Sequence, residues 1–227
     1  MYVIAPLSNC ASPEKRDRFL EYIAKIAPVT LQSERKCHGY AWFRNAEDYN
    51  TVPHHWLRGL EIYEDIEANT ETHRASAEYK AFRAAVGAEN LLDRPSDLRF
   101  WRPLLGYLVY QGKPVDFSFS IGRQYIVTTE LTPSPGQKDQ VVEQLRLLAQ
   151  EANQRQVPSF WVLHRGEGDE GQQDESLLVF SMHNDFDAWT DFEHQAHIEA
   201  AWVKAYEFCA DKRLTTWVES GLGFLGR

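Results

Sequence analysis

The chain contains a weak internal repeat with a period of about 121 residues, and this repeat constrains the fold more than any other feature. Each half opens with an apolar segment typical of a strand, at 2–7 and at 125–131. A Ser-Pro dipeptide follows in both halves, which predicts a helix with a serine cap and a proline in its first turn. From Phe19 onward, apolar residues recur at the i, i+3, i+4 and i+7 spacing of an amphipathic helix.

The rest of each half continues this parallel. Two strands, a second helix and a final tryptophan-bearing strand follow, so the order β-α-β-β-α-β of the ferredoxin-like unit occurs twice. In the first half we expect strands at 38–44 and 60–64, a helix at 76–86 and a strand at 98–102. In the second half we expect strands at 159–165 and 177–182, a helix at about 192–209 and a strand at 214–218.

A single ferredoxin-like sheet has two helices on one face and must bury its other face elsewhere. Two such units in one chain can press their open sheets together and close a barrel. The sequence therefore predicts an α+β fold in which two fused ferredoxin-like repeats, 1–110 and 111–227, form an intramolecular dimeric α/β-barrel. Two separate domains are the alternative arrangement.

Composition narrows the classes of partner. The formal net charge of −9 over 227 residues, without a basic run, argues against binding to nucleic acid or to an anionic membrane surface. No apolar stretch approaches the length needed to span a bilayer. The three cysteines are far apart and fit no metal-binding spacing, and the N-terminus lacks the pattern of a signal peptide. We therefore expect a cytoplasmic protein with reduced thiols.

One motif in the first half resembles a known family. The segment 61–68 reads as a strand followed by a Glu-Ala turn, and a helix start with the spacing H-x-x-S-x-x-[FY]-x-x-F follows. This pattern is similar to that of the antibiotic biosynthesis monooxygenase family of the dimeric α/β-barrel superfamily; in this chain it is made by His73, Ser76, Tyr79 and Phe82. The second half retains a degraded form, in which His194 aligns with His73 and His197 replaces the serine. The chain thus looks like a tandem fusion of two family units.

The resemblance implies a function and a set of partners. The family includes oxygenases that need no metal, heme or flavin and act on electron-rich phenols, as well as quinol monooxygenases and heme-degrading enzymes. By this resemblance we expect a cofactor-independent oxygenase, or a related tailoring enzyme of secondary metabolism, that takes an aromatic, phenolic small molecule and O2. We expect a monomeric pseudo-dimer or a homodimer. A non-catalytic binding or auxiliary barrel protein and a non-oxidative cyclase or isomerase are the alternatives.

The chemistry requires a base whose pKa is near neutrality, and histidine is the usual choice. Ser76 is expected to cap the second helix, which places His73 just before it. His194 is expected to point inward, on the helix face of Trp202. His73 and His194 are therefore the candidate catalytic residues. The candidate substrate-binding residues are aromatic or histidine side chains suited to flat rings: Tyr40, Trp42, Tyr63, Trp101, Trp161, His183, His197 and Trp217.

Each of these residues also has a purely structural reading, as part of the core or of the surface. Two other sites stay open at this point. A metal site could combine His194 and His197 with Glu193 or Asp191, in the manner of a two-histidine, one-carboxylate centre. Heme binding by a histidine near Trp189 is the second alternative, whereas the favoured reading needs no cofactor and no metal.

Overall fold

The computed structural model of the protein describes residues 1–118, 124–165 and 175–227. Close packing divides the chain into two compact units. Each unit takes segments from both sides of the boundary expected at residue 110. The first unit comprises Met1–Phe100, Pro114–Gly122 and Trp217–Arg227, and the second comprises Trp101–Lys113 and Arg123–Thr216.

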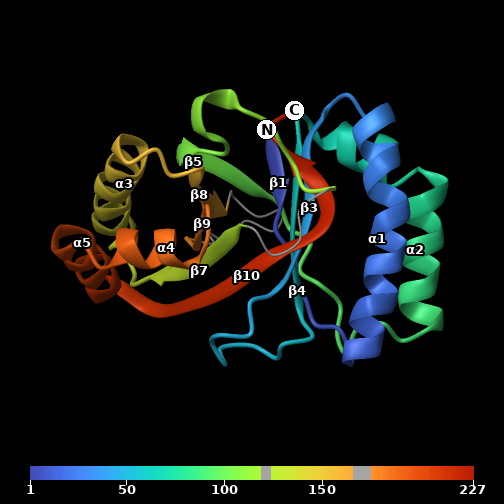
Figure 1. Ribbon diagram of the computed structural model, residues 1–227, viewed down its shortest axis with the longest axis horizontal. Coiled ribbons are helices and arrows are strands. Elements are labelled where there is room, and N and C mark those ends of the chain that lie inside the picture. Colours follow the sequence, from blue (N-terminus) through green and yellow to red (C-terminus); the bar gives the residue numbers. More distant parts are fainter. Residues whose placement is uncertain (119–123, 166–174) are drawn as a thin grey trace. The chain divides into compact units, whose positions relative to one another are not determined.

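The first unit is a sheet with two helices on one face (Figure 1). Its sheet order is β1 and β2, then β4, β3 and the end of β10, with β6 paired to β10. Pro6 separates β1 from β2, because proline has no N–H to donate to the ladder. The elements are β1 (Tyr2–Ile4), β2 (Leu7–Ser8), α1 (Pro13–Ser33), β3 (Cys37–Asn45), β4 (Leu57–Tyr63), the π-helical turn η1 (Ala68–His73), α2 (Ala77–Ala88), β6 (Val115–Asp116) and the Trp217–Leu225 part of β10 (Cys209–Leu225).

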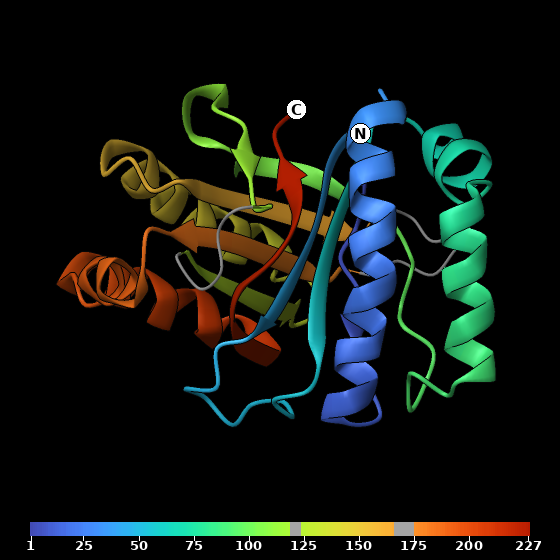
Figure 2. The same ribbon diagram turned by 45° about the vertical axis from the view of Figure 1, so that its right-hand side comes forward.

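Helices α1 and α2 lie side by side, and both views show them on the same side of the strands of this unit (Figures 1 and 2). The Ser12 side chain accepts a hydrogen bond from the Lys15 N–H and Pro13 is the first helical residue, as the sequence predicts. Phe19, Ile23 and Ile26 are buried on the inner face of α1. They pack with residues of β3, β4 and α2 in one apolar core.

The second unit repeats this plan. Its strands are ordered β5, β8, β9, β7, followed by the start of β10, and α3 and α5 pack against each other. The buried apolar residues of α3, α5 and these strands form its core. The elements are β5 (Trp101–Tyr107), the 3-10 turn η2 (Tyr110–Gly112), β7 (Tyr125–Pro133), α3 (Lys138–Gln154), β8 (Ser159–Arg165), β9 (Leu177–His183), α4 (Phe186–Glu193) and α5 (Ala196–Glu207).

Two local predictions for the second unit are wrong. The Ser134-Pro135 dipeptide does not begin a helix, because the chain turns there, Gln137 precedes the helix and α3 starts only at Lys138. The helix expected at about 192–209 is α5, which spans only Ala196–Glu207, and a separate helix that was not expected, α4, precedes it across a break at His194 and Gln195. Within the described residues, none of the helices combines the length and the apolar character needed to cross a membrane.

Candidate active site

His73 is fixed in position by the start of α2. Ser76 caps this helix: its hydroxyl accepts a hydrogen bond from the Tyr79 N–H at 3.2 Å and donates one to the His73 carbonyl oxygen at 2.8 Å. The cap predicted from the sequence is therefore confirmed, and it ties His73 to the helix entry. Because η1 carries His73 inward, the side chain is fully buried, with 0% of its surface exposed.

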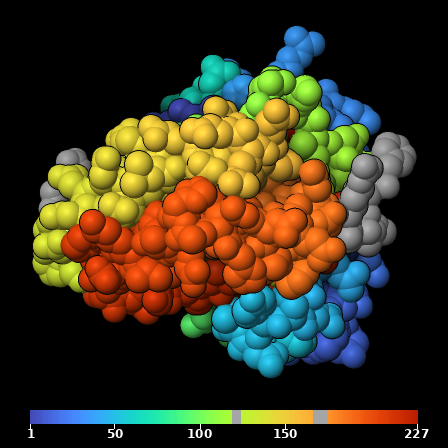
Figure 3. Space-filling model, turned by 60° about the vertical axis from the view of Figure 1, so that its left-hand side comes forward, coloured from blue at the N-terminus to red at the C-terminus, as the bar shows by residue number. Residues whose placement is uncertain are grey.

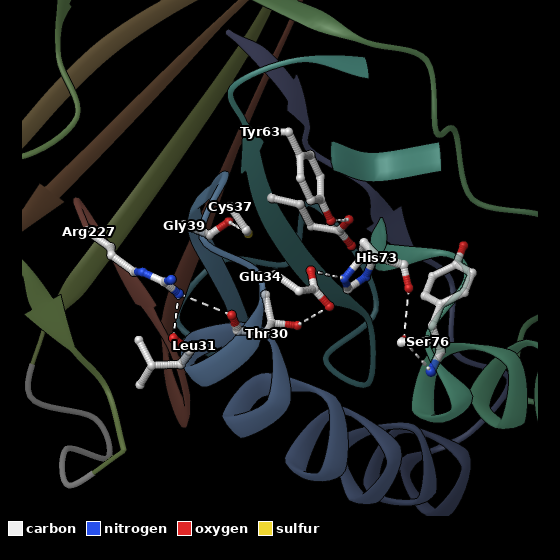
Figure 4. A network of polar contacts seen from close by, with 11 residues as sticks. Thr30, Leu31, Glu34, Cys37, Gly39, Tyr63, His73, Ser76 and Arg227 are labelled. Atoms are coloured by element: carbon white, nitrogen blue, oxygen red, sulfur yellow. Dashed lines mark hydrogen bonds and ion pairs between the residues drawn. The ribbon is translucent and has the colours of Figure 1, made fainter. Parts of the chain in front are cut away.

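A buried carboxylate pairs with this imidazole. Glu34 ends α1, and its Oε2 lies 2.9 Å from the Nδ1 of His73 (Figure 4). The second oxygen of Glu34 accepts a hydrogen bond from the Thr30 hydroxyl at 3.3 Å. Since a carboxylate can only accept, the hydrogen of a neutral His73 ring lies on Nδ1 and the lone pair lies on Nε2.

Three tyrosines surround the imidazole. The ring centroids of Tyr40, Tyr63 and Tyr79 lie 5.1, 5.6 and 5.0 Å from that of His73. The Nε2 atom of His73 is buried and has no hydrogen-bond partner. A buried polar atom without a partner is costly, so native structures seldom keep one without a purpose. The unpartnered Nε2 therefore makes His73 a candidate proton acceptor of this cluster.

A second buried carboxylate, Glu61, lies on β4 in the same cluster. Its Oε2 accepts a hydrogen bond from the Tyr63 hydroxyl at 2.9 Å. Burial raises the pKa of Glu61, and the opposing influences of nearby His73 and of the Tyr63 hydroxyl do not cancel this effect. A carboxyl group with a raised pKa can exchange protons closer to neutral pH than an exposed one.

Glu61 lines a narrow cavity of about 20 Å³ within the first unit. A cavity of this size holds one water molecule. His73 does not line this cavity, whereas Glu61 and Tyr79 do. The other lining residues form an apolar inner wall and a polar rim: Ile4, Pro6, Ser8, Phe19, Trp42, Asn69, Arg74, Phe82, Arg83, Leu92, Ser96 and Leu98.

The second unit places an apolar residue where the first has His73. His73 precedes the cap residue Ser76 by three positions, and Phe192 precedes Gln195, which begins α5, by the same number. The Phe192 ring contacts Phe160 and His183 at centroid distances of 6.4 and 5.6 Å, much as His73 contacts Tyr40 and Tyr63. Phe192 is thus the counterpart of His73.

The expectation that His194 aligns with His73 and points inward is wrong. His194 is exposed at the end of α4, because the chain leaves the helix there. In the first unit, Glu61 on β4 lies opposite Tyr40 on β3. In the second unit, Ser181 on β9 lies opposite Phe160 on β8, so Ser181 takes the place of Glu61. The acid–base cluster therefore belongs to the first unit, and a catalytic role for His194 stays an untested prediction.

The remaining candidate residues are distributed over both units. In the first unit, Tyr40 and Tyr63 contact His73, Trp42 lines the cavity against Phe19, and Trp217 is buried in β10. In the second unit, the Cζ atom of Arg165 lies 3.8 Å from the centroid of the Trp101 ring, and Trp161 is buried in β8. His197 is exposed, and its Nε2 lies 3.4 Å from Glu151.

His183 lines a separate cavity of about 300 Å³ in the second unit, whose outer face of α3, α4 and α5 is visible in Figure 3. The side chain is 2% exposed, and its Nε2 lies 3.3 Å from the Ser181 hydroxyl. Burial lowers the pKa of His183 to about 4. The imidazole is therefore neutral at physiological pH.

The metal site considered from the sequence has no matching geometry in the described part of the chain. No three histidine, cysteine or acidic side chains converge there as metal ligands would. Glu193 instead accepts a hydrogen bond from the Trp202 indole N–H at 3.2 Å, and burial raises its pKa to about 7. His197 is paired with Glu151 on α3.

The family assignment rests on the segment that builds the acid–base cluster. A model of the antibiotic biosynthesis monooxygenase (ABM) family matches residues 1–85, which include Glu34, Glu61 and His73. Residues 1–85 thus carry the match to the ABM family, and this segment is here called the ABM domain. The resemblance predicted from the histidine and serine spacing is thereby confirmed. No curated protein matches the chain significantly.

Solved structures extend the likeness from the ABM domain to nearly the whole chain. A candidate monooxygenase from Lactobacillus acidophilus is 8% identical, with a TM-score of 0.70 over 98% of this chain and 96% of the other. One from Fusobacterium nucleatum subsp. nucleatum is 12% identical, with a TM-score of 0.74 over 98% and 95%. An anthrone oxidase-like protein is 17% identical, with a TM-score of 0.65 over 96% and 90%.

At these identities the likeness shows the fold alone. The predicted fold class, α+β with two fused ferredoxin-like repeats of the dimeric α/β-barrel type, is confirmed. Two parts of the site were missed. Glu61 lies in the recognised motif but was not chosen as a site residue, and Glu34 is 39 positions from His73 in a segment without a motif. A sequence spacing cannot reveal a pair that only tertiary packing creates.

Proposed function

We propose that the ABM domain of the first unit is the active site of a cofactor-independent oxygenase, or a related tailoring enzyme, that acts on an aromatic, phenolic small molecule. The observation that carries the proposal is the free, buried Nε2 of His73 behind a cavity-lining Glu61 with a raised pKa. Acid–base groups with perturbed pKa values cluster at functional sites. The proposed substrate class extends to this chain the name of the anthrone oxidase-like protein, with which it shares the fold.

The chemistry asks little of the protein beyond proton transfer. Glu61 removes the acidic proton of the bound phenol or of an activated CH2 group. The resulting anion is electron-rich enough to reduce O2 and form a carbon–oxygen bond. Loss of water from the peroxide leaves a carbonyl, so the overall change is RCH2R′ + O2 → RC(=O)R′ + H2O. His73, oriented by Glu34, offers its Nε2 as a second proton acceptor behind Glu61.

The size of the cavity limits what enters its interior. About 20 Å³ suits O2 or a single hydroxyl oxygen next to Glu61, whereas a whole ring needs several hundred Å³. The residues 93–100, here called the strap, follow α2 without a helix or strand and contribute Ser96 and Leu98 to the lining. We propose that the strap moves to admit the ring.

The narrow cavity also favours a second candidate function. If the cavity stays closed, a ring cannot reach Glu61, and a binding or auxiliary protein is favoured over an oxygenase. Such a protein could hold its ligand at the rim. A non-oxidative cyclase or isomerase would use the same Glu61 and His73 for proton transfer but would consume no O2. Oxygen uptake separates these alternatives from the proposal.

The test is oxygen uptake by metal-stripped protein with a small panel of anthrones and hydroquinones. We expect Glu61→Gln to lower turnover by roughly 10²- to 10⁴-fold, the usual effect of losing a general base. His73→Phe, which copies the second unit, is expected to lower turnover while retaining the fold. Phe192→Leu in the second unit is the matched control and should leave turnover unchanged. Unaltered uptake in both first-unit variants would refute the proposal.

A further inference from the structure

Two arginines lie at the rim of the cavity, and neither forms a salt bridge within the part of the chain that the structure describes. Arg74 follows η1 and Arg83 lies on α2, and both line the cavity together with Tyr79. Within the described residues, no carboxylate lies in ion-pair distance of either guanidinium.

The second unit shows that this arrangement is specific to the first. Counted from the residue that begins each second helix, Glu193 is the counterpart of Arg74 and Trp202 is the counterpart of Arg83. Glu193 and Trp202 satisfy each other through a hydrogen bond of 3.2 Å. Within the described residues, the two arginines of the first unit form no such hydrogen-bonded pair, and Arg74 acts on Glu61 only through its charge, so both guanidiniums keep N–H groups for a ligand.

The phenol of Tyr79 belongs to the same rim. Burial raises the pKa of Tyr79, whereas Arg74 and Arg83 act in the opposite direction, which places both guanidiniums within electrostatic range of its hydroxyl. Two guanidiniums and a phenol O–H form a donor set suited to an oxyanion. Deeper in the cavity, Phe19, Trp42 and Phe82 form an apolar wall, and Glu61 would repel a negative charge there.

We propose that the cavity, once the strap has moved, takes an aromatic carboxylate, with its acid group at Arg74 and Arg83 and its ring directed toward the apolar wall. This inference rests on the proposed function for its site and adds the charge class of the substrate. The lining sets the orientation of the ligand. The arginines make the rim cationic, the aromatic wall is apolar, and Glu61 makes the floor acidic. The acid group stays at the rim and the reacting carbon or hydroxyl approaches Glu61.

A matched pair of fluorescent probes tests the inference. We would measure the Kd of 2-anthracenecarboxylate and of the neutral 2-anthracenemethanol for the full chain. The carboxylate should bind at least tenfold more tightly than the alcohol. Arg74→Met and Arg83→Met should each weaken carboxylate binding by about tenfold, since a charge-assisted hydrogen bond is lost, and leave alcohol binding unchanged. Arg35→Met, an exposed arginine outside the cavity lining, is the control.

The outcomes separate this inference from the proposed function. Equal affinities for the two probes, no measurable binding of the carboxylate, or full carboxylate affinity in the Arg74→Met/Arg83→Met double variant would overturn the inference. Oxygen uptake with neutral anthrones alone would overturn it while supporting the oxygenase. Selective carboxylate binding without oxygen uptake from any anthrone carboxylate would support the rim site and count against the oxygenase.

Discussion

At the scale of single residues, the two units differ in a few side chains at equivalent places. His73 and Glu61 of the first unit correspond to Phe192 and Ser181 of the second, and each set is buried in its unit. The fold therefore accommodates either an acid–base cluster or a mostly apolar one at this position. The cluster is consequently explained better by chemistry than by a structural need for charge.

The buried His183 gives a prediction about stability and pH. Its pKa is about 4 in the folded protein, against 6.5 for an ordinary histidine, because burial disfavours the charged ring. Between these values the unfolded chain binds more protons, so acidification favours unfolding. The contribution of His183 to stability is complete above about pH 6.5 and is lost as the pH falls towards 4, by up to about 3 kcal/mol.

This contribution is measurable as a difference between two proteins. We expect the free energy of unfolding in urea to fall less steeply between pH 6.5 and pH 4.5 in His183→Gln than in the wild type, because glutamine does not titrate. Subtracting the free energy of unfolding of the variant from that of the wild type at each pH cancels the contribution of the other titrating groups, which the two proteins share. Identical slopes for the two proteins would show that His183 is not held neutral by burial.

At the scale of elements, the sequence predicts regular structure well where local periodicity decides it. The strand predicted at 159–165 is β8, and the Ser12-Pro13 start of α1 is confirmed. The sequence fails where tertiary packing decides. The α4–α5 break follows no proline or glycine, and the partners of the last strands are not encoded by the repeat: β5 pairs with β8 and the end of β10 pairs with β3.

The strap at 93–100 carries the prediction at this scale. It is held to the unit by several contacts, among them the Asp93 N–H to Asn9 carbonyl bond and the Tyr2–Phe100 ring pair, and one contact joins the Ser96 and Ser8 hydroxyls across 3.0 Å at the cavity. Side chains that close can accommodate a disulfide, so Ser8→Cys/Ser96→Cys should fix the strap when oxidised. We expect the oxidised variant to lose ring binding and turnover, and dithiothreitol to restore both.

Ser96→Cys alone serves as the control, because it cannot form the designed crosslink. It should behave as the wild type under both conditions. Full activity of the oxidised double variant, with the crosslink confirmed by mass spectrometry, would mean that the substrate reaches Glu61 without movement of the strap.

At the scale of the whole molecule, the repeat and the motif were enough to predict the fold class and the ABM domain. The composition of the site was predicted only in part. His73, Tyr40, Tyr63 and Trp42 were expected and lie together around or beside the cavity. Glu34 was not, because its pairing with His73 arises from the packing of the end of α1 against η1.

We propose that the two units, although built on one plan, differ in role, and that the first carries the chemistry. The most direct measurement is oxygen uptake, with an anthrone as substrate, by metal-stripped wild-type protein and by the Glu61→Ser/His73→Phe variant, which gives the first unit the residues of the second. We predict uptake above the uncatalysed rate in the wild type and none in the variant, which should still fold but with a lower free energy of unfolding, because the buried Glu34 loses its partner. Equal uptake by the two proteins would contradict the claim.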